Sequence, residues 1–143
     1  MSKGGGSRDG FSMVQRVRFG DLDAMQHLNN VEYLRFFETA RIEFVTELSD
    51  GNPGQPGGVG WLIVECHINY CAQAHFHEDI RTWIRPLEVK RSSVKLGFEM
   101  RVDADDRLVA EGWGTLVAYD YSAGRVARLA TPLRERLEGL LSR

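Results

Sequence analysis

A single amphipathic segment, residues 31–48, constrains the fold of this chain most strongly. Apolar side chains recur in it at helical spacing, and polar side chains fall on the opposite face. The apolar stripe consists of Tyr33, Phe36, Phe37, Ala40, Phe44 and Leu48. A stripe this wide and this aromatic has to be covered by other parts of the chain, and a sheet wrapped against the helix is the simplest cover.

The rest of the chain has the residue pattern of strands. A partly alternating segment from Phe11 to Phe19 predicts a first strand, and four longer strands are predicted at residues 61–70, 79–89, 92–102 and 107–120. We expect these four in meander order, with a turn at residues 103–107 joining the last two. A short helix from Thr131 follows. The sequence therefore predicts an α+β domain in which an antiparallel sheet wraps around a long central helix.

Length and composition indicate one globular domain. With 143 residues the chain can bury a core without disulfides or metal, and we expect a flexible tail at residues 1–10 before a single domain at residues 11–143. The net charge is -2 with acids and bases interspersed, so no nucleic-acid-binding patch is visible.

Cys66 and Cys71 are too far apart on one strand to bond to each other. With no signal peptide or membrane span in the sequence, we expect a cytoplasmic protein with no cofactor and no membrane partner.

Polar residues of types that act in catalysis lie immediately ahead of the long helix. Asp21 and Asp23 are followed by His27, and Asn29 and Asn30 close the cluster as candidate helix caps. A carboxylate there lies near unpaired backbone N–H groups, which also stabilise an oxyanion on a substrate carbonyl. Asp23 could then attack a carbonyl or act as general base on water. Residue spacing alone leaves a second interpretation open, in which the cluster only forms a loop and a cap.

Two further polar groups have alternative interpretations. His75 and His77 could share a strand face, but a metal site there lacks a fourth ligand, and surface histidines are the commoner case. A basic and hydroxyl cluster at the start of the third long strand suits phosphate oxygens, although it also suits a solvated strand start. This cluster consists of Lys90, Arg91, Ser92 and Ser93.

No GxSxG, GxGxxG or P-loop motif occurs in the sequence. The nucleophilic-serine, dinucleotide-binding and phosphoryl-transfer classes therefore lack their signatures.

The segment from Asp21 to Arg41, DLDAMQHLNNVEYLRFFETAR, resembles the opening motif of the hotdog-fold acyl-CoA thioesterases of the 4-hydroxybenzoyl-CoA thioesterase family. That motif is close to D-x-D-x-x-x-H-x-N-N-x-x-Y, with E-x-A-R further along. Outside the motif the resemblance extends through the order and length of the strands. It implies the hotdog fold and the hydrolysis of an acyl-CoA thioester to a free acid and CoA.

The resemblance also implies roles for single residues. The family's catalytic carboxylate falls on Asp23, and the backbone N–H that receives the thioester oxygen falls on Asn30. His27 matches a histidine in the similar run of plant acyl-carrier-protein thioesterases, but Met25 stands where those proteins have an asparagine. Some bacterial relatives carry a histidine where this chain has Asn30. Family residues that bind the CoA phosphates match Lys90, Arg91 and Ser93 approximately, and Tyr33 is a candidate for the acyl pocket.

Hotdog active sites lie between two subunits, so the resemblance implies a homodimer or a homotetramer. Two other functions stay open. One is non-hydrolytic binding of acyl-CoA or an acyl-carrier protein, which the departures at Met25 and Asn30 would fit. The other is a hotdog dehydratase acting on a β-hydroxyacyl thioester, against which the D-x-D motif speaks. The sequence does not choose among aryl, short-chain and long-chain acyl groups.

Overall fold

The predicted helices and strands are all present in the computed structural model, which describes residues 10–52, 54 and 58–141. Apart from Gly10, the expected tail at residues 1–10 lies outside the described residues. The elements are β1 (Phe11–Arg16), a 3-10 turn (Phe19–Asp21), α1 (Asn30–Leu48), β2 (Val59–Tyr70), β3 (Asp79–Val89), β4 (Ser93–Val102), β5 (Leu108–Asp120), β6 (Arg125–Val126) and α2 (Thr131–Leu141). The short strand β6 is the one described strand that the sequence pattern did not predict.

One antiparallel sheet holds the strands in the order β1-β3-β4-β5-β2, with β6 beside β5. The predicted meander is correct for β3, β4 and β5. It was wrong for β2, which pairs with β5 because β1 occupies the position beside β3. The chain therefore crosses from the β2 edge of the sheet, past β5 and β4, to the inner strand β3 at residues 71–78. We call this segment the crossing loop.

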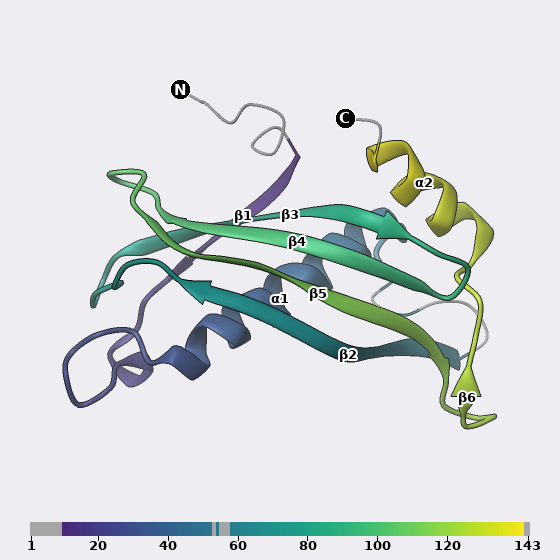
Figure 1. Cartoon of the computed structure of the whole chain (residues 1–143), viewed down its shortest axis with the longest axis horizontal. Coiled ribbons are helices and arrows are strands. Elements are labelled where there is room, and N and C mark those ends of the chain that lie inside the picture. Colours follow the sequence, from purple (N-terminus) through teal and green to yellow (C-terminus); the bar gives the residue numbers. More distant parts are fainter. Residues whose placement is uncertain (1–9, 53, 55–57, 142–143) are drawn as a thin grey trace.

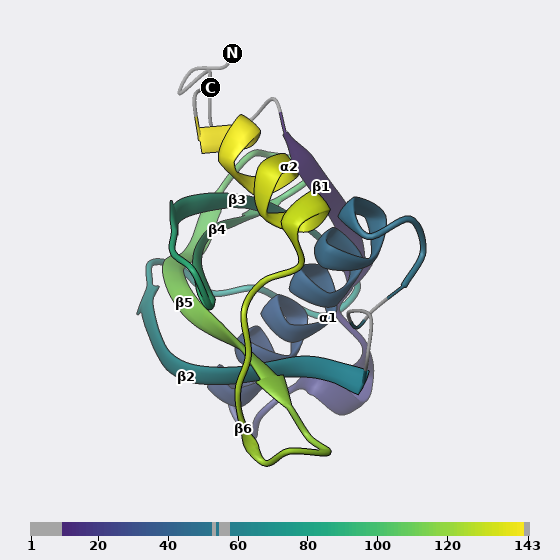
Figure 2. The ribbon, with the colours of Figure 1, turned by 90° about the vertical axis from the view of Figure 1, so that its right-hand side faces the viewer.

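The sheet curls around α1, so that the helix lies inside it (Figures 1 and 2). The aromatic stripe is buried as predicted, with Leu48 only half-buried at the end of the helix. Phe37 stacks on Phe98 of β4 with ring centroids 4.4 Å apart. A Cβ atom on Gly114 would lie only 2.9 Å from the Phe37 ring, so a glycine at this position lets the sheet approach the helix closely.

The first helix is capped at its start, and the second helix packs on the core. Asn29 caps α1 through its side-chain oxygen, which accepts a hydrogen bond from the Val31 N–H at 3.0 Å. Leu133 and Leu137 anchor α2 by burying their side chains in the core. Both cysteines are free, as predicted. Within the described residues, no helix combines the length and apolar character that crossing a membrane requires.

Candidate active site

The turn of residues 22–28, here called the Asp23 turn, holds the Asp23 carboxylate in one place. Its Oδ1 accepts hydrogen bonds from the backbone N–H groups of Met25 at 2.8 Å and His27 at 3.2 Å. The Asp23 N–H donates to the His27 carbonyl at 2.8 Å, which closes the turn. Oδ2 has no hydrogen-bond partner among the residues that the structure describes. One carboxylate oxygen is therefore anchored, and the other is open to a ligand.

The start of α1 lies beside this turn and presents a free donor. The Asn29 cap takes up the N–H of Val31, and the Asn29 carbonyl accepts from the Glu32 N–H at 2.8 Å. The backbone N–H of Asn30, the first helical residue, has no acceptor in the described part of the chain. Because the positive end of the helix dipole lies at the same place, this N–H is suited to a partly negative oxygen.

An open hollow of about 500 Å³ connects the carboxylate with the helix start, and it brings together four predicted site residues: Asp23, His27, Asn30 and Tyr33. The remaining lining residues are Leu28, Tyr70, Cys71, Ala72 and Gln73. The Tyr70 hydroxyl donates to the Asn30 carbonyl at 3.2 Å, which ties the end of β2 to the helix start. Burial raises the pKa of Tyr33, so its phenol stays neutral at physiological pH.

Asp21, the first acid of the pair, has a structural role. Its buried carboxylate accepts hydrogen bonds at 2.9 Å from both the backbone N–H and the guanidinium of Arg18. Its carbonyl accepts from the Asn29 N–H at 2.9 Å. Burial by itself would raise the pKa of Asp21, but the hydrogen bonds and charge of Arg18 outweigh it and hold the pKa below its usual value. Asp21 therefore stabilises the segment that leads into the Asp23 turn.

Replacing Asp21 with asparagine should lower the free energy of unfolding by about 1–3 kcal/mol near neutral pH, because charge-assisted hydrogen bonds at a buried site are lost. The folded state lowers the pKa of Asp21, so its stabilisation is present above the ordinary value of 3.8 and is lost as pH falls through the folded-state pKa. Denaturant unfolding of both proteins should therefore show a difference that shrinks in acid. A difference independent of pH would contradict this role.

The predicted phosphate-binding residues lie at the other end of the chain's fold. Lys90 and Arg91 lie in the turn between β3 and β4 and Ser93 begins β4, whereas the Asp23 turn lies near the start of β3 (Figure 1). β3 has 11 residues, so roughly 33 Å separates its ends at about 3.3 Å per residue. Within one chain the structure does not bring these residues to the hollow.

His75 lies next to His27, a contact that the sequence analysis missed. The two residues form an antiparallel bridge, and their ring centroids are 5.5 Å apart. Among the described residues, no group of three or more His, Cys, Asp and Glu side chains is arranged to hold a metal. Tyr70 and the charged pair Glu78 and Arg107 were also missed. Their position next to predicted strand ends was the only signal, and it did not indicate which ends meet.

Comparison with known families gives a match over most of the chain. The model described as the thioesterase-like superfamily matches residues 17–137. Among curated proteins, the long-chain acyl-CoA thioesterase FadM of Escherichia coli (strain K12) is 25% identical over 126 residues, which covers 88% of this chain and 96% of that protein.

Solved structures with the same fold are also named as thioesterases. The probable thioesterase YbaW from Escherichia coli has a TM-score of 0.79 at 24% identity, over 92% of this chain and 99% of that one. A thioesterase from Thermus thermophilus, solved with coenzyme A and zinc, has a TM-score of 0.78 at 26% identity, over 92% and 94% of the two chains. These likenesses confirm the predicted hotdog fold, in which the sheet wraps around the central helix.

Proposed function

The chain belongs to the thioesterase-like superfamily, and from this premise we propose that it hydrolyses an acyl-CoA thioester to a free acid and CoA, with Asp23 as nucleophile or general base. The resemblance seen in the sequence is confirmed for the family and the fold. One observation supports the proposal most directly: Asp23 and Asn30 line the same hollow, and within the described residues neither Asp23 Oδ2 nor the Asn30 N–H has a hydrogen-bond partner. A carbonyl bound between them would have its carbon near the carboxylate and its oxygen near the donor.

Two routes lead to the same products. In the first, Oδ2 of Asp23 attacks the carbonyl carbon and expels CoA thiolate, and water then hydrolyses the mixed anhydride. In the second, Asp23 takes a proton from water, the water oxygen attacks, and the tetrahedral intermediate expels the thiolate. In both, the Asn30 N–H stabilises negative charge on the carbonyl oxygen. A thiol has a pKa of about 8.5, so the thiolate leaves without a strong general acid.

The departures from related motifs are compatible with this chemistry. Met25 supplies its backbone N–H to Asp23, while its side chain is 72% exposed and takes no part in the hollow. Asn30 acts in the proposal through its backbone N–H. Its role therefore depends on its position at the helix start and less on its side chain. His27 anchors Asp23 through its backbone N–H and lines the hollow. In the proposal its imidazole orients Asp23 or water.

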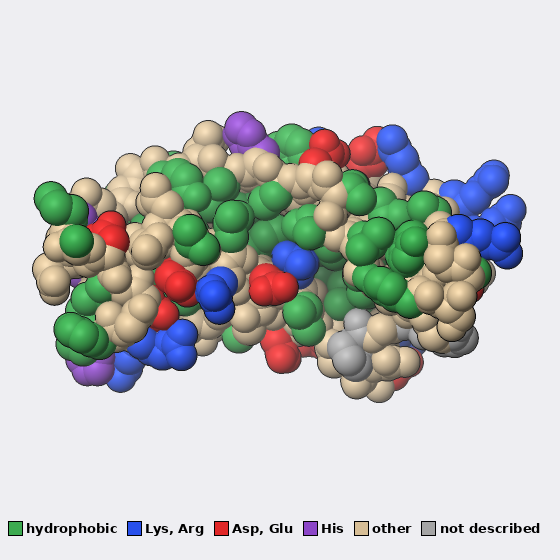
Figure 3. All heavy atoms as spheres, turned by 90° about the horizontal axis from the view of Figure 1, so that it is seen from below, with side chains coloured by type: hydrophobic (Ala, Val, Ile, Leu, Met, Phe, Trp, Pro, Cys, Tyr) green, Lys and Arg blue, Asp and Glu red, His purple; other side chains and the backbone are tan. Residues whose placement is uncertain are grey.

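A second copy of the chain completes the site in this proposal. β2 is an edge strand of 12 residues on which Ile63 and Val64 are 41% and 56% exposed. A groove of about 420 Å³ between α1 and β2 continues this apolar surface through Val31 and Leu34. Figure 3 shows hydrophobic side chains over this side of the molecule, with acidic and basic side chains among them. A long exposed edge strand is stabilised by pairing with another strand, so we infer a homodimer in which two β2 strands pair. A homotetramer would be a pair of such dimers.

Pairing of this kind also accounts for the distant basic cluster. Antiparallel pairing about a two-fold axis reverses the direction of the second chain. The β3–β4 turn of one subunit then lies at the same end of the dimer as the Asp23 turn of the other. There Lys90, Arg91 and Ser93 of the partner subunit can bind the nucleotide phosphates of CoA, while the acyl-pantetheine arm lies between the subunits.

Thiol release from a panel of aryl, short-chain and long-chain acyl-CoA esters, followed with a thiol-reactive dye, tests the function. We expect turnover with at least one class. The matching S-acyl-pantetheine lacks the nucleotide phosphates. Its kcat/KM should be lower by at least about tenfold, because charge-assisted hydrogen bonds are lost. Binding without thiol release would contradict hydrolysis and favour a binding protein. An enoyl product from a hydroxyacyl thioester would favour a dehydratase.

A further inference from the structure

The crossing loop forms one wall of the hollow and contacts the Asp23 turn directly. Cys71, Ala72 and Gln73 line the hollow. Further along the loop, the Ala74 carbonyl accepts a hydrogen bond from the Leu28 N–H at 2.9 Å, and His75 forms the bridge with His27. The position of this loop therefore helps to determine the position of the turn.

The Asp23 turn transmits this contact to the carboxylate. Leu22 and Leu28 form an antiparallel bridge, and the Asp23 N–H donates to the His27 carbonyl at 2.8 Å. His27 thus has Asp23 on one side and His75 on the other. Two rows of backbone contacts connect the crossing loop with Asp23, so a displaced loop would displace the carboxylate.

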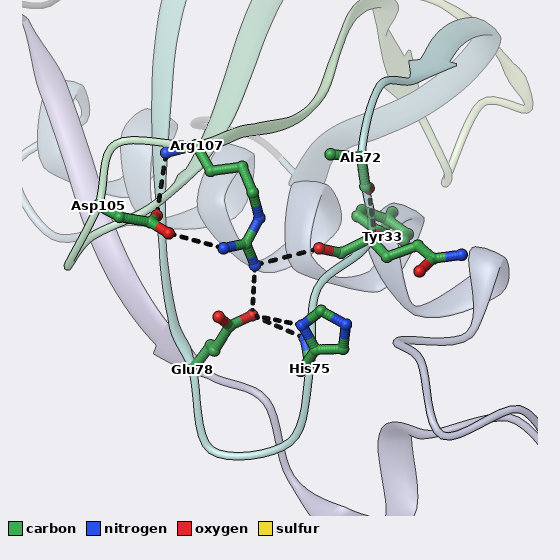
Figure 4. Close-up of polar contacts among 7 residues, drawn as sticks. Tyr33, Ala72, His75, Glu78, Asp105 and Arg107 are labelled. Carbon is green, nitrogen blue, oxygen red and sulfur yellow. Dashed lines mark hydrogen bonds and ion pairs between the residues drawn. The ribbon is translucent and has the colours of Figure 1, made fainter.

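Arg107 holds the crossing loop near both of its ends. It follows the β4–β5 turn, and its Nη2 donates to the Gln73 carbonyl at 3.1 Å and to Glu78 Oε1 at 2.7 Å. Its Nη1 donates to Asp105 Oδ2 at 2.7 Å, which orients the guanidinium. Figure 4 shows the guanidinium between Asp105, Glu78 and the loop. Arg107 itself is not among the residues that line the hollow.

Glu78 connects Arg107 with His75. Its Oε1 also accepts a hydrogen bond from the His75 N–H at 2.7 Å and lies 3.5 Å from His75 Nδ1. Burial by itself would raise the pKa of Glu78, but hydrogen bonds from Arg107 and from the His75 backbone hold it below the usual value. Glu78 is therefore ionised at neutral pH, where it binds the guanidinium most strongly.

We propose that Arg107 is a positioning residue for thioester hydrolysis: by holding Gln73 and Glu78 it fixes the crossing loop, and through the loop it keeps Asp23 in its reactive position. The planar fork of arginine is needed, because a lysine ammonium does not span Gln73, Glu78 and Asp105 with the same geometry. The kinetic part of this proposal rests on the proposed function. Misplacing a reacting group by about 1 Å is enough to cost roughly a hundredfold in rate.

Arg107→Lys keeps the charge and removes the fork. We expect kcat to fall about ten- to a hundredfold with KM changed by less than about twofold, because the carboxylate is displaced while most substrate contacts remain. Hydrogen exchange at the amides of Asp23 and Leu28 should become faster. The matched control is Arg81→Lys: its side chain is 33% exposed against 30% for Arg107, and its 2.8 Å ion pair holds Asp103 of the same β4–β5 turn. The control should change neither kcat nor this exchange.

Glu78→Gln is a second variant in case Arg107→Lys does not fold. It removes the charge that binds Arg107 and keeps an oxygen for the His75 N–H. We therefore expect the same result as for Arg107→Lys, a lower kcat with KM nearly unchanged. Unchanged kcat and exchange in these variants, or an equal effect of Arg81→Lys, would overturn the positioning role. If the wild type hydrolyses no thioester but the variants exchange faster at the Asp23 turn, the proposed function fails and the structural role of Arg107 stands.

Discussion

Asp23→Asn should reduce kcat for thioester hydrolysis by about 10²–10⁴-fold while the fold and ligand binding persist. The amide oxygen can still accept the N–H groups of Met25 and His27, so the turn keeps its shape. The amide nitrogen replaces the open carboxylate oxygen, and it can neither attack a carbonyl nor take a proton from water. Thiol release gives kcat, calorimetric titration with CoA gives binding, and thermal unfolding reports the fold.

Asp120→Asn is the matched control for this prediction. Asp120 Oδ1 accepts the N–H groups of Ser122 at 2.9 Å and Ala123 at 3.0 Å, so it anchors a turn in the same way at the other end of the chain. Its replacement should leave kcat unchanged. Near-normal turnover of Asp23→Asn would remove Asp23 from the mechanism. A comparable loss in both variants would show that turn geometry, and not the open carboxylate, accounts for the effect.

Val64→Lys should separate the proposed dimer into monomers and remove most of the activity. Val64 is 56% exposed on the β2 edge, and pairing of two edges would remove the ammonium of a lysine there from water. Burying this charge should weaken association by about 3 kcal/mol, roughly a hundredfold in Kd. Turnover should fall in parallel, because the proposed site takes its phosphate-binding residues from the second subunit.

Sedimentation velocity and thiol release at the same protein concentration test this outcome. Val126→Lys is the control, because Val126 on β6 is also 56% exposed but is separated from β2 by β5. It should leave both association and turnover unchanged. A Val64→Lys monomer with full activity would show that one chain holds a complete site. A dimer that persists would place the subunit contact elsewhere.

The local elements of this protein follow from short-range patterns in its sequence. The spacing of Tyr33, Phe37 and Phe44 predicted the face of α1 that is buried, because one face of a helix repeats every three to four residues. The alternation in β4 predicted its buried residues for the corresponding reason. Asn29 as cap and Asp23 in the turn before it are equally local, since their partners lie within a few residues.

Tertiary structure decided which of these elements meet. Nothing in the pattern of β2 distinguishes pairing with β3 from pairing with β5, because a strand presents the same alternation and backbone donors to either neighbour. That pairing requires the crossing loop, and the loop places His75 against His27 and Glu78 against Arg107. The sequence by itself therefore determined the helix, the strands and the candidate carboxylate. The residues that surround this carboxylate from distant parts of the chain depended on strand order, which is set by long-range packing and not by local pattern.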